Sequence, residues 1–424
     1  MAASKTVAFH TLGCKLNYSE TSTLSRMLES EGFQKRGFEQ KADVYVINTC
    51  SVTENADREC RHLVRRIQRK SPESLVVITG CYAQLKPKEI AEIKGVDLVL
   101  GAAEKFNIAS HLRELSKGDS AKICSCDVED ISKFHPSYSL HDRTRTFLKV
   151  QDGCSYNCSF CTIPMARGKS RSDRIQDVVD RVEHLAGEGI KEIVLTGVNL
   201  GDFGSGQISA IGQQENFFQL LTALNQVDGI SRYRISSIEP NLLSSEIIDL
   251  VSKSDKIMPH FHIPLQSGSN KILAMMRRRY KRELYSDTIY RIKELIPHCA
   301  IGADVIVGFP GETELEFQET VEFLHELEIS YLHVFTYSER NNTKALEIKP
   351  VVPIGERHQR NKVLRNLSYK KMQYFIAQHT GTSRKVLFER QGSQPMMEGY
   401  TDNYIKVQIP YNSQFVNSVV EWGI

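Results

Sequence analysis

The first hundred residues alternate short apolar, β-branched runs with stretches of helical periodicity. The apolar runs are TVAFHTLG, DVYVINT and SLVVITG, and helical patterns follow them near residues 18–31, 54–70 and 87–94. Strands that alternate with helices in this way are typical of βαβ units and a parallel sheet. A polar, aperiodic segment at residues 118–145 interrupts the alternation, and we interpret it as a linker.

The alternation then resumes with a longer period. Helical stretches such as RIQDVVDRVEHLAGEG separate six further apolar runs. Six β/α units in this order predict a partial barrel, whose working face lies at the carboxyl ends of its strands. The six strand candidates are residues 146–153, 191–199, 232–240, 260–268, 300–311 and 331–338.

The end of the chain has a third character. Short β-like runs (KVLFER, MEGYT, YIKVQI, SVVEW) are separated by Gly, Pro, Asn and Ser, which predicts a small all-β module. The predicted fold class is therefore α/β, with a parallel-sheet N-terminal domain, a partial (β/α)6 barrel and a small C-terminal all-β module. The predicted domains are residues 1–118, 140–378 and 379–424, with a linker at 119–139.

Composition fits a globular protein of several domains, because 424 residues include 41% hydrophobic and 25% charged side chains. No run of 18 apolar residues appears, and the N-terminus lacks the layout of a signal peptide. We therefore expect a cytoplasmic protein with no membrane partner, and we expect a monomer. Cysteines stay reduced in the cytoplasm, so clusters among the ten cysteines predict metal ligands before disulfides.

Positive charge is unevenly distributed although the net charge is only +3. Between Arg340 and Lys385 stand eleven Lys and Arg residues against two Glu, and MRRRYKR at residues 276–282 is a second basic run. Such runs favour an RNA partner, because Lys and Arg displace counterions from phosphates. A solvated helix face is the alternative.

Three cysteines follow the first predicted barrel strand in a C-x3-C-x2-C array: Cys154, Cys158 and Cys161. A structural zinc site normally has four ligands, and no fourth candidate lies close by in the sequence. Three thiolates can instead hold three irons of a four-iron, four-sulfur cluster and leave the fourth iron open. Zinc binding, a disulfide and core packing are the competing interpretations.

Each of the three N-terminal strands is also followed by a cysteine, namely Cys14, Cys50 and Cys81. The carboxyl ends of parallel strands share one edge of a sheet, so these thiols could converge and hold a second cluster. Buried structural cysteines are the alternative. Four cysteines have no partners at matching positions, and we interpret them as structural: Cys60, Cys124, Cys126 and Cys299.

CSYNCSFC resembles the signature of the radical S-adenosylmethionine enzymes. Together with TLGCKLNYSE, INTCSVTENAD, VITGCYAQ and the β module, it resembles the methylthiotransferase family along nearly the whole chain. That resemblance implies a methylthiotransferase domain, a radical domain and a TRAM module that binds RNA. It further implies two 4Fe-4S clusters, an auxiliary one on Cys14, Cys50 and Cys81 and a radical one on the loop cysteines.

Within this family, TLGCKLNYSE and IPMARGKSRS most resemble the branch that methylthiolates C2 of threonylcarbamoyladenosine, next to the anticodon of tRNA. Other branches act on isopentenyladenosine in tRNA or on a ribosomal protein. A non-catalytic zinc-binding RNA adaptor is the rival from another class, because it would also have cysteines and basic runs.

The hypothesis for the reaction has two halves. One S-adenosylmethionine gives a methyl group to a sulfur at the auxiliary cluster, and a second is cleaved to a radical at the other cluster. Cofactors carry this chemistry, so no side chain is assigned a catalytic role. An electron donor and a sulfur source are further partners, and both clusters would have to face one cavity.

Polar residues at the ends of the barrel strands are predicted to contact S-adenosylmethionine, with strand caps and turns as the alternative for each. They are Gly197, Asn199, Ser236, Glu239, Gln266, Ser267 and Asp304. Basic residues predicted to contact the tRNA anticodon stem-loop are Arg277, Arg278, Arg279, Lys370, Lys371, Arg384 and Lys385. We also expect Tyr400 and Tyr404 to be exposed and to stack on bases.

Overall fold

The computed structural model describes residues 5–51, 54–118, 120–205, 214–389 and 395–424. The chain forms two compact units, each made of more than one segment. Unit 1 consists of Met1–Asp142, Phe147–Tyr156 and Cys161–Arg171. Unit 2 consists of Arg143–Thr146, Asn157–Phe160 and Ser172–Ile424.

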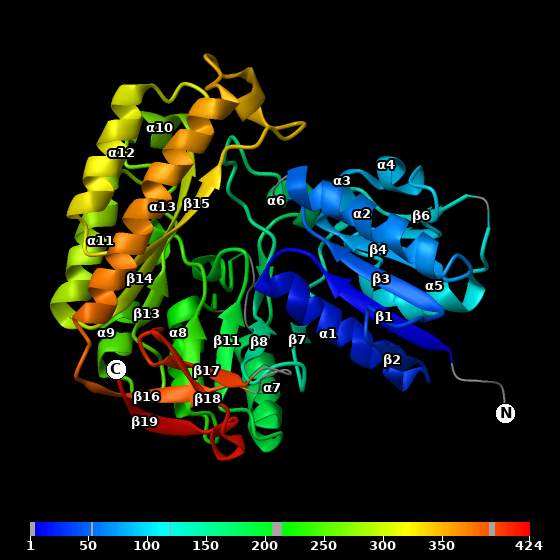
Figure 1. Ribbon diagram of the computed structural model, residues 1–424, viewed down its shortest axis with the longest axis horizontal. Helices are drawn as coiled ribbons and strands as arrows, with labels where there is room; N and C mark the ends of the chain where they lie inside the picture. Colours follow the sequence, from blue (N-terminus) through cyan, green and yellow to red (C-terminus); the bar gives the residue numbers. More distant parts are fainter. Residues whose placement is uncertain (1–4, 52–53, 119, 206–213, 390–394) are drawn as a thin grey trace. The chain divides into compact units, whose positions relative to one another are not determined.

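A six-stranded parallel sheet with the strand order β2-β1-β3-β4-β5-β6 forms the centre of unit 1 (Figure 1). Because all the strands run in one direction, their carboxyl ends lie at one edge of the sheet. The strands are β1 (Thr6–Thr11), β2 (Gln34–Arg36), β3 (Val44–Thr49), β4 (Leu75–Gly80), β5 (Leu98–Leu100) and β6 (Lys122–Cys124).

Helices cover both faces of this sheet. On one face Val46 of β3 shares a core with Leu24 of α1 and Ile108 of α5. On the other face the next residue, Ile47, shares a core with Leu63 of α2. This alternation is the period of two that a strand buried on both faces must have. The helices are α1 (Lys15–Ser30), α2 (Glu54–Lys70), α3 (Cys81–Leu85), α4 (Pro87–Ala91) and α5 (Ile108–Glu114).

Two local features differ from the expected pattern. The helix expected near 87–94 is a pair of short helices, α3 and α4, and α4 begins at Pro87, which lacks the N–H to continue a preceding helix. Within the segment interpreted as a linker, Lys122–Cys124 forms β6 of the sheet. A strand of three residues is too short for its alternation to be recognised in a polar stretch.

Short elements from the middle of the chain complete unit 1. β7 pairs in antiparallel fashion with β8, where Ser137 opposes Lys149. A two-residue strand and a one-turn helix flank the loop that carries Cys154 and Cys161 in unit 1, and Cys158 between them belongs to unit 2. These elements are β7 (Ser137–Tyr138), β8 (Thr146–Lys149), β9 (Gln151–Asp152), α6 (Ile163–Arg167) and β10 (Arg171–Ser172).

Parallel strands alternating with helices form most of unit 2, and the predicted α/β fold class is confirmed. β11 pairs with β12, and β13, β14 and β15 form a second parallel group. Isolated parallel bridges link the two groups, between Ser237 and His262 and between Tyr233 and Ile257. The strands are β11 (Glu192–Thr196), β12 (Arg232–Ile235), β13 (His260–His262), β14 (Ala300–Val307) and β15 (Tyr331–Thr336). The helices are α7 (Ile175–Gly187), α8 (Phe217–Gln226), α9 (Ser245–Lys253), α10 (Asn270–Met275), α11 (Arg282–Leu295), α12 (Glu314–Glu326) and α13 (Ile354–Ala377).

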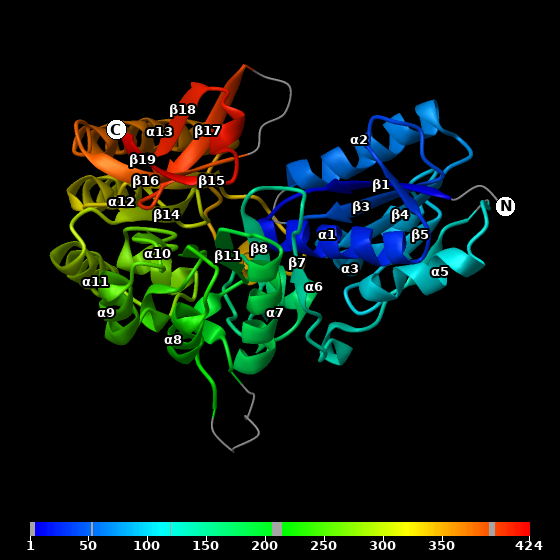
Figure 2. The same ribbon diagram turned by 90° about the horizontal axis from the view of Figure 1, so that it is seen from below.

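Four antiparallel strands follow α13 in the order β18-β17-β16-β19 (Figure 2). Their core meets the rest of unit 2 where Ile405 packs with Ala300 and Phe375. Two buried arginines of β12 also donate to backbone carbonyls of the module: Arg232 to Lys385 at 2.6 Å and Arg234 to Asp402 at 3.0 Å. The strands are β16 (Ser383–Phe388), β17 (Met396–Thr401), β18 (Lys406–Pro410) and β19 (Val419–Gly423).

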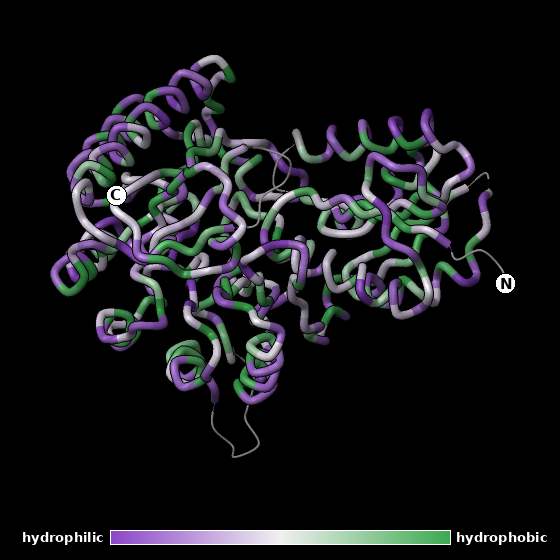
Figure 3. The backbone as a smooth tube through the Cα atoms, turned by 60° about the horizontal axis from the view of Figure 1, so that its bottom comes forward, coloured by the Kyte–Doolittle hydropathy of each residue, from purple (hydrophilic) through white to green (hydrophobic). Residues whose placement is uncertain are grey.

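Hydropathy along the backbone matches these layers. Figure 3 shows hydrophilic and hydrophobic turns alternating along the outer helices, as expected for helices with one buried face. Among the described residues, no helix combines the length and apolar character needed to cross a bilayer.

Candidate iron–sulfur and cofactor sites

Cys14, Cys50 and Cys81 lie at neighbouring strand ends in unit 1. The end of β1 meets the end of β3, because the Leu12 N–H donates to the Asn48 carbonyl at 2.8 Å. The end of β3 meets the end of β4, where Thr49 is the register partner of Gly80. The structure thus brings the three predicted ligands to one edge of one sheet.

Two glycines allow these strand ends to approach closely. Gly13 has φ +101°, and a Cβ built there would lie 2.6 Å from Cβ and 2.9 Å from Sγ of Cys50. Gly80 has φ +98°, and its Cβ would lie 2.3 Å from the carbonyl oxygen of Thr49. Real side chains do not tolerate such contacts, so only glycine fits at either position.

Asn17, a residue that the sequence prediction did not single out, ties the same strand ends together. Its buried Nδ2 donates to the carbonyl of Leu12 at 2.9 Å and to that of Thr49 at 3.0 Å. Its Oδ1 accepts from Nη2 of Arg167 at 2.6 Å. The available signal was its position one helical turn after Cys14 on α1, where its side chain faces the same edge of the sheet.

Charged side chains are buried beside these cysteines in unit 1. Glu20 of α1 forms ion pairs with Arg167, Lys105 and Lys149, with N–O distances of 3.1, 2.6 and 3.0 Å. Burial alone would raise the pKa of Glu20, but the charges of these three cations outweigh burial and hold that pKa well below its usual range. Burial would also raise the pKa of Asp152, but nearby cations lower it, among them Arg167 at 2.8 Å. Both carboxylates are therefore ionised at neutral pH.

Each thiol of the C-x3-C-x2-C loop has an N–H group directed at it. The backbone N–H of Tyr156 donates to Sγ of Cys154 at 3.4 Å, and that of Ile163 donates to Sγ of Cys161 at 3.4 Å. Nη1 of Arg278 donates to Sγ of Cys158 at 3.2 Å. Such donors stabilise sulfur in its anionic form, which is the form that binds iron.

Arg278 was predicted to contact RNA, but its side chain is almost fully buried. Besides Cys158 it pairs with Glu239, one of the predicted S-adenosylmethionine contacts. Burial opposes the charge of this guanidinium, yet Tyr280 and Glu239 raise its pKa well above the ordinary value. Arg278 therefore links a thiol of the loop to the polar end of a barrel strand within unit 2.

Asp304 lies on β14 between two histidines that the sequence prediction did not name. Its Oδ1 is 2.9 Å from Nε2 of His262 on β13 and 3.3 Å from Nδ1 of His333 on β15. Burial would raise the pKa of Asp304, but the hydrogen bonds from both imidazoles hold it well below its usual range. Period-two alternation could have identified the trio, because all three side chains occupy the same face of adjacent strands.

The remaining predicted cofactor contacts lie at strand ends of unit 2, and several have partners within the protein. Asn199 Oδ1 accepts from the backbone N–H of Glu239 at 3.3 Å. Ser267 is fully buried, with its hydroxyl 3.3 Å from that of Thr320. Gln266 has φ +70°, and its backbone N–H donates to the backbone carbonyl of Asp304 at 2.8 Å. Ser236 is buried, whereas Gly197 is half-buried.

The predicted RNA contacts differ in their exposure. Lys371 caps helix α12 by donating to the carbonyl of Leu327 at 2.7 Å, and burial lowers its pKa to about 8. Arg384 contacts both carboxylate oxygens of Asp402, at 2.8 and 2.9 Å. The other side chains of the predicted set are exposed, apart from Arg278: Arg277, Arg279, Lys370 and Lys385.

Two expectations about exposed surface are wrong. Of the eleven basic residues in the run, Arg340, Arg357 and Arg360 are buried. Helix α13 packs Arg360 onto the carboxylate of Glu312 and Arg357 onto the carbonyl of Val352. Tyr400 and Tyr404 are half-buried and stack on each other at 5.0 Å. A composition count cannot distinguish a charged face in solvent from one paired inside a unit.

Comparison with known proteins gives two family matches and relatives that align over nearly the whole chain. Residues 6–101 match the uncharacterized protein family UPF0004, and residues 148–324 match the radical SAM superfamily. The chain is 40% identical to the threonylcarbamoyladenosine tRNA methylthiotransferase MtaB of Bacillus subtilis, over 98% of this chain and 93% of that protein. MtaB of Aquifex aeolicus is also 40% identical, over 95% of this chain and 96% of that protein.

The chain belongs to the radical S-adenosylmethionine methylthiotransferase family. Among solved structures, the radical S-adenosylmethionine methyltransferase TsrM of Kitasatospora setae has the same type of fold, with a TM-score of 0.56 and 16% identity. The alignment covers 78% of this chain and 75% of that one. The predicted enzyme class, with S-adenosylmethionine and an iron–sulfur cluster as cofactors, is confirmed.

Proposed function

We propose that this methylthiotransferase modifies C2 of threonylcarbamoyladenosine in tRNA, next to the anticodon, with two 4Fe-4S clusters. One observation carries the proposal: Cys14, Cys50 and Cys81 lie together at one sheet edge in a chain that also has the C-x3-C-x2-C loop. Each set offers three thiolates, which suits a four-iron cluster with one open iron. The likeness to the two MtaB proteins supports the choice of nucleoside and of tRNA.

The donor chemistry of both sites suits such clusters. When bound, the clusters and S-adenosylmethionine would supply the radical and the methylthio group, which side chains cannot supply. The protein's part is to orient thiolates, direct N–H groups at sulfur and exclude water. Cys154, Cys158 and Cys161 would hold the radical cluster, with Arg278 beside Cys158.

Several parts of the proposal concern binding partners. Gly197, Asn199, Ser236, Glu239, Gln266, Ser267 and Asp304 are the proposed contacts of S-adenosylmethionine. For RNA, the exposed side chains of Arg277, Arg279, Lys370 and Lys385 are the proposed phosphate contacts. Arg278, Lys371 and Arg384 would contribute through the local field, because they already have partners in the protein. A monomeric state, a cytoplasmic location, an electron donor and a sulfur source complete the proposal.

The test is a product analysis with protein purified without oxygen. The enzyme is incubated with S-adenosylmethionine, a reductant and tRNA that contains threonylcarbamoyladenosine, and the digested nucleosides are weighed by mass spectrometry. We expect one methylthio group to replace one hydrogen on that nucleoside, and about eight irons per chain, four for each cluster.

Parallel incubations with isopentenyladenosine tRNA and with ribosomal protein distinguish the other branches of the family. Methylthiolation of either substrate in preference to threonylcarbamoyladenosine would overturn the substrate assignment. A colourless, zinc-loaded protein without product would support an RNA adaptor instead.

A further inference from the structure

Six charged side chains are buried together in unit 1, and positive charge is in excess among them. The anions are Glu20 and Asp152, and the side chains of all six are at most 10% exposed. The cations are Lys105, Lys149, Arg167 and Arg171. Four cations against two carboxylates leave a surplus of two positive charges.

Among the described residues that line the neighbouring cavity, none cancels this surplus. Asp130 and Lys133 line the same cavity, but both are exposed and their charges offset each other. His135 also lines it, and burial together with Lys149 lowers its pKa to about 4, so it is neutral at pH 7. Uncompensated buried charge is strongly unfavourable, which implies that an anion belongs here.

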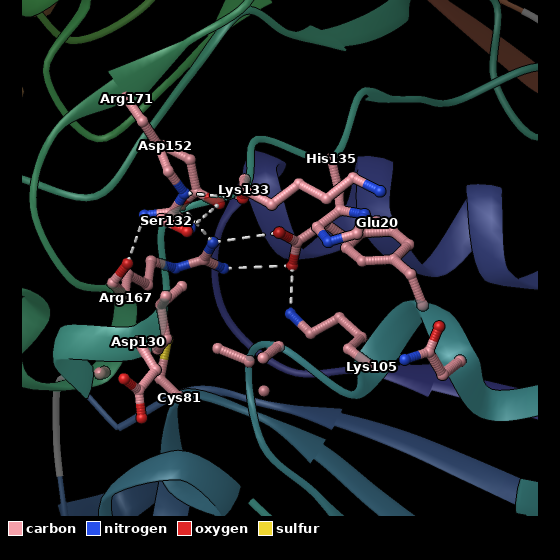
Figure 4. A pocket seen from close by; sticks show the side chains of 17 residues that line it. Glu20, Cys81, Lys105, Asp130, Ser132, Lys133, His135, Asp152, Arg167 and Arg171 are labelled. Atoms are coloured by element: carbon pink, nitrogen blue, oxygen red, sulfur yellow. Dashed lines mark hydrogen bonds and ion pairs between the residues drawn. The ribbon is translucent and has the colours of Figure 1, made fainter. Parts of the chain in front are cut away.

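The surplus lies beside Cys81, one of the strand-end cysteines. A cavity of about 240 Å³ lies among Cys81, Lys105 and Arg167, and Figure 4 shows Arg167 bridging Glu20 and Asp152 on its wall. Lys105 donates to Oε2 of Glu20 at 2.6 Å, the same oxygen that Nη2 of Arg167 contacts at 3.2 Å. Cys14 and Cys81 are close enough for their charges to act on Arg167.

Charge arithmetic gives the number of negative charges that would balance the surplus. A four-iron core of charge about +2 with three thiolates has a net charge of about −1, which would leave one positive charge in the pocket. A single small monoanion on the open iron would neutralise the remainder. The cavity is polar and large enough for such an ion.

We propose that the counter-charge of the auxiliary cluster is formed by four cations, Lys105, Lys149, Arg167 and Arg171. Among them, Lys105 is a positioning residue that sets the cluster's reduction potential and its affinity for a monoanionic sulfur species such as hydrosulfide. This inference rests on the proposed function, because it requires the auxiliary cluster on Cys14, Cys50 and Cys81. It adds the side chains that balance the charge of the cluster and attract the sulfur anion.

The test uses full-length protein in which Cys154, Cys158 and Cys161 are all replaced by alanine, so that any cluster signal comes from the auxiliary site. Redox titration followed by electron paramagnetic resonance gives the potential. Lys105→Met removes a positive charge, so reduction should become at least about tenfold less favourable, a shift of about 59 mV for one electron. Lys105→Arg should restore the potential.

Glu20→Gln and Asp152→Asn each remove a negative charge and should shift the potential in the opposite direction. A purely structural role would not produce shifts of opposite sign. Matched controls are Lys117→Met and Asp97→Asn, whose side chains form an ion pair at 2.8 Å. This pair lies near the start of β4, and the length of the strand separates it from Cys81 by about 15 Å. If either carboxylate variant fails to fold, the Lys105→Met and Lys105→Arg pair decides the outcome.

The same protein is titrated with sodium hydrosulfide while its spectrum is recorded. Lys105→Met should weaken hydrosulfide binding at least about tenfold. Unchanged potentials and affinities, or shifts of one sign for lysine and carboxylate variants, would overturn this inference alone. Absence of iron from the triple alanine protein would instead overturn the two-cluster proposal.

Discussion

The two cysteine trios are built by different means. Cys154, Cys158 and Cys161 belong to one loop, so a few backbone torsions set their spacing. Cys14, Cys50 and Cys81 belong to three strands, and the register of β1, β3 and β4 brings them together. The loop trio is a property of a local motif, whereas the strand-end trio exists only when the sheet of unit 1 has folded.

The surroundings of the trios differ as well. In unit 2, the guanidinium beside Cys158 is paired with Glu239, so that corner is close to neutral. In unit 1, the buried charges near Cys81 are positive in excess. Since positive surroundings favour anionic ligands, this contrast suits different tasks: S-adenosylmethionine, which carries a positive sulfonium, at one site and a sulfur anion at the other.

Removing a ligand from either trio should give the largest effect and should distinguish their tasks. Cys158→Ala should abolish both S-adenosylmethionine cleavage to 5′-deoxyadenosine and methylthio transfer. Cys50→Ala should abolish transfer but leave some cleavage, because the radical cluster remains. Both products are quantified by liquid chromatography and mass spectrometry, with Cys60→Ala in helix α2 as the control that keeps both activities. Full transfer by Cys50→Ala would remove the auxiliary cluster from the proposal.

This division also explains what the sequence could and could not predict. The C-x3-C-x2-C spacing singled out the loop trio as candidate ligands, the family resemblance favoured a cluster there, and the parallel-sheet rule predicted Cys14, Cys50 and Cys81 at one edge. The charge cluster had no such signal, because Glu20, Lys105 and Arg167 stand far apart in the sequence and meet only after folding. Arg278 illustrates the converse, since a basic run indicated RNA contact for a side chain that is buried against a thiol.

The strand-end trio should be the more sensitive of the two to backbone crowding. Gly13→Ala places a methyl group against Cys50, so we expect the auxiliary cluster to be lost and iron per chain to fall by about half. Iron analysis and visible absorption after anaerobic reconstitution measure this loss.

Gly32→Ala separates crowding from backbone strain. Gly32 also has positive φ, +89°, but nothing lies within 4 Å of its added Cβ. It should therefore retain the iron of the wild-type protein despite a similar conformational cost. Equal loss of iron from both variants would show that strain, not contact with Cys50, is responsible.

Arg278 tests the surroundings of the loop trio. Arg278→Gln keeps a hydrogen-bond donor but removes the charge that faces Cys158 and Glu239. We expect S-adenosylmethionine cleavage to fall about 10–100-fold, the usual effect of losing a partner of a metal ligand. The auxiliary cluster should be unaffected in a Cys154→Ala background, where its spectrum is observed alone. Arg277→Gln, on the exposed neighbouring position, should leave cleavage unchanged.

The smallest expected effect concerns stability, and it tests whether Glu20 is tied to its cations before any cluster binds. In cluster-free protein at pH 7, Glu20→Gln leaves Arg167, Lys105 and Lys149 with one carboxylate fewer, and we expect a loss of about 3–5 kcal/mol from the unfolding free energy of unit 1. Hydrogen exchange of peptides from β3 and β4 measures this quantity, with the exposed Glu92→Gln as a control that changes it by no more than about 0.5 kcal/mol.

The folded state lowers the pKa of Glu20, so its contribution is complete above the ordinary value of 4.5 and disappears as the pH falls through the lower folded value. The difference between wild type and Glu20→Gln should therefore be constant near neutrality and should shrink only in acid. A difference that instead grew as the pH fell would mean that the carboxyl is neutral in the folded protein, and the count of buried charges in unit 1 would have to be revised.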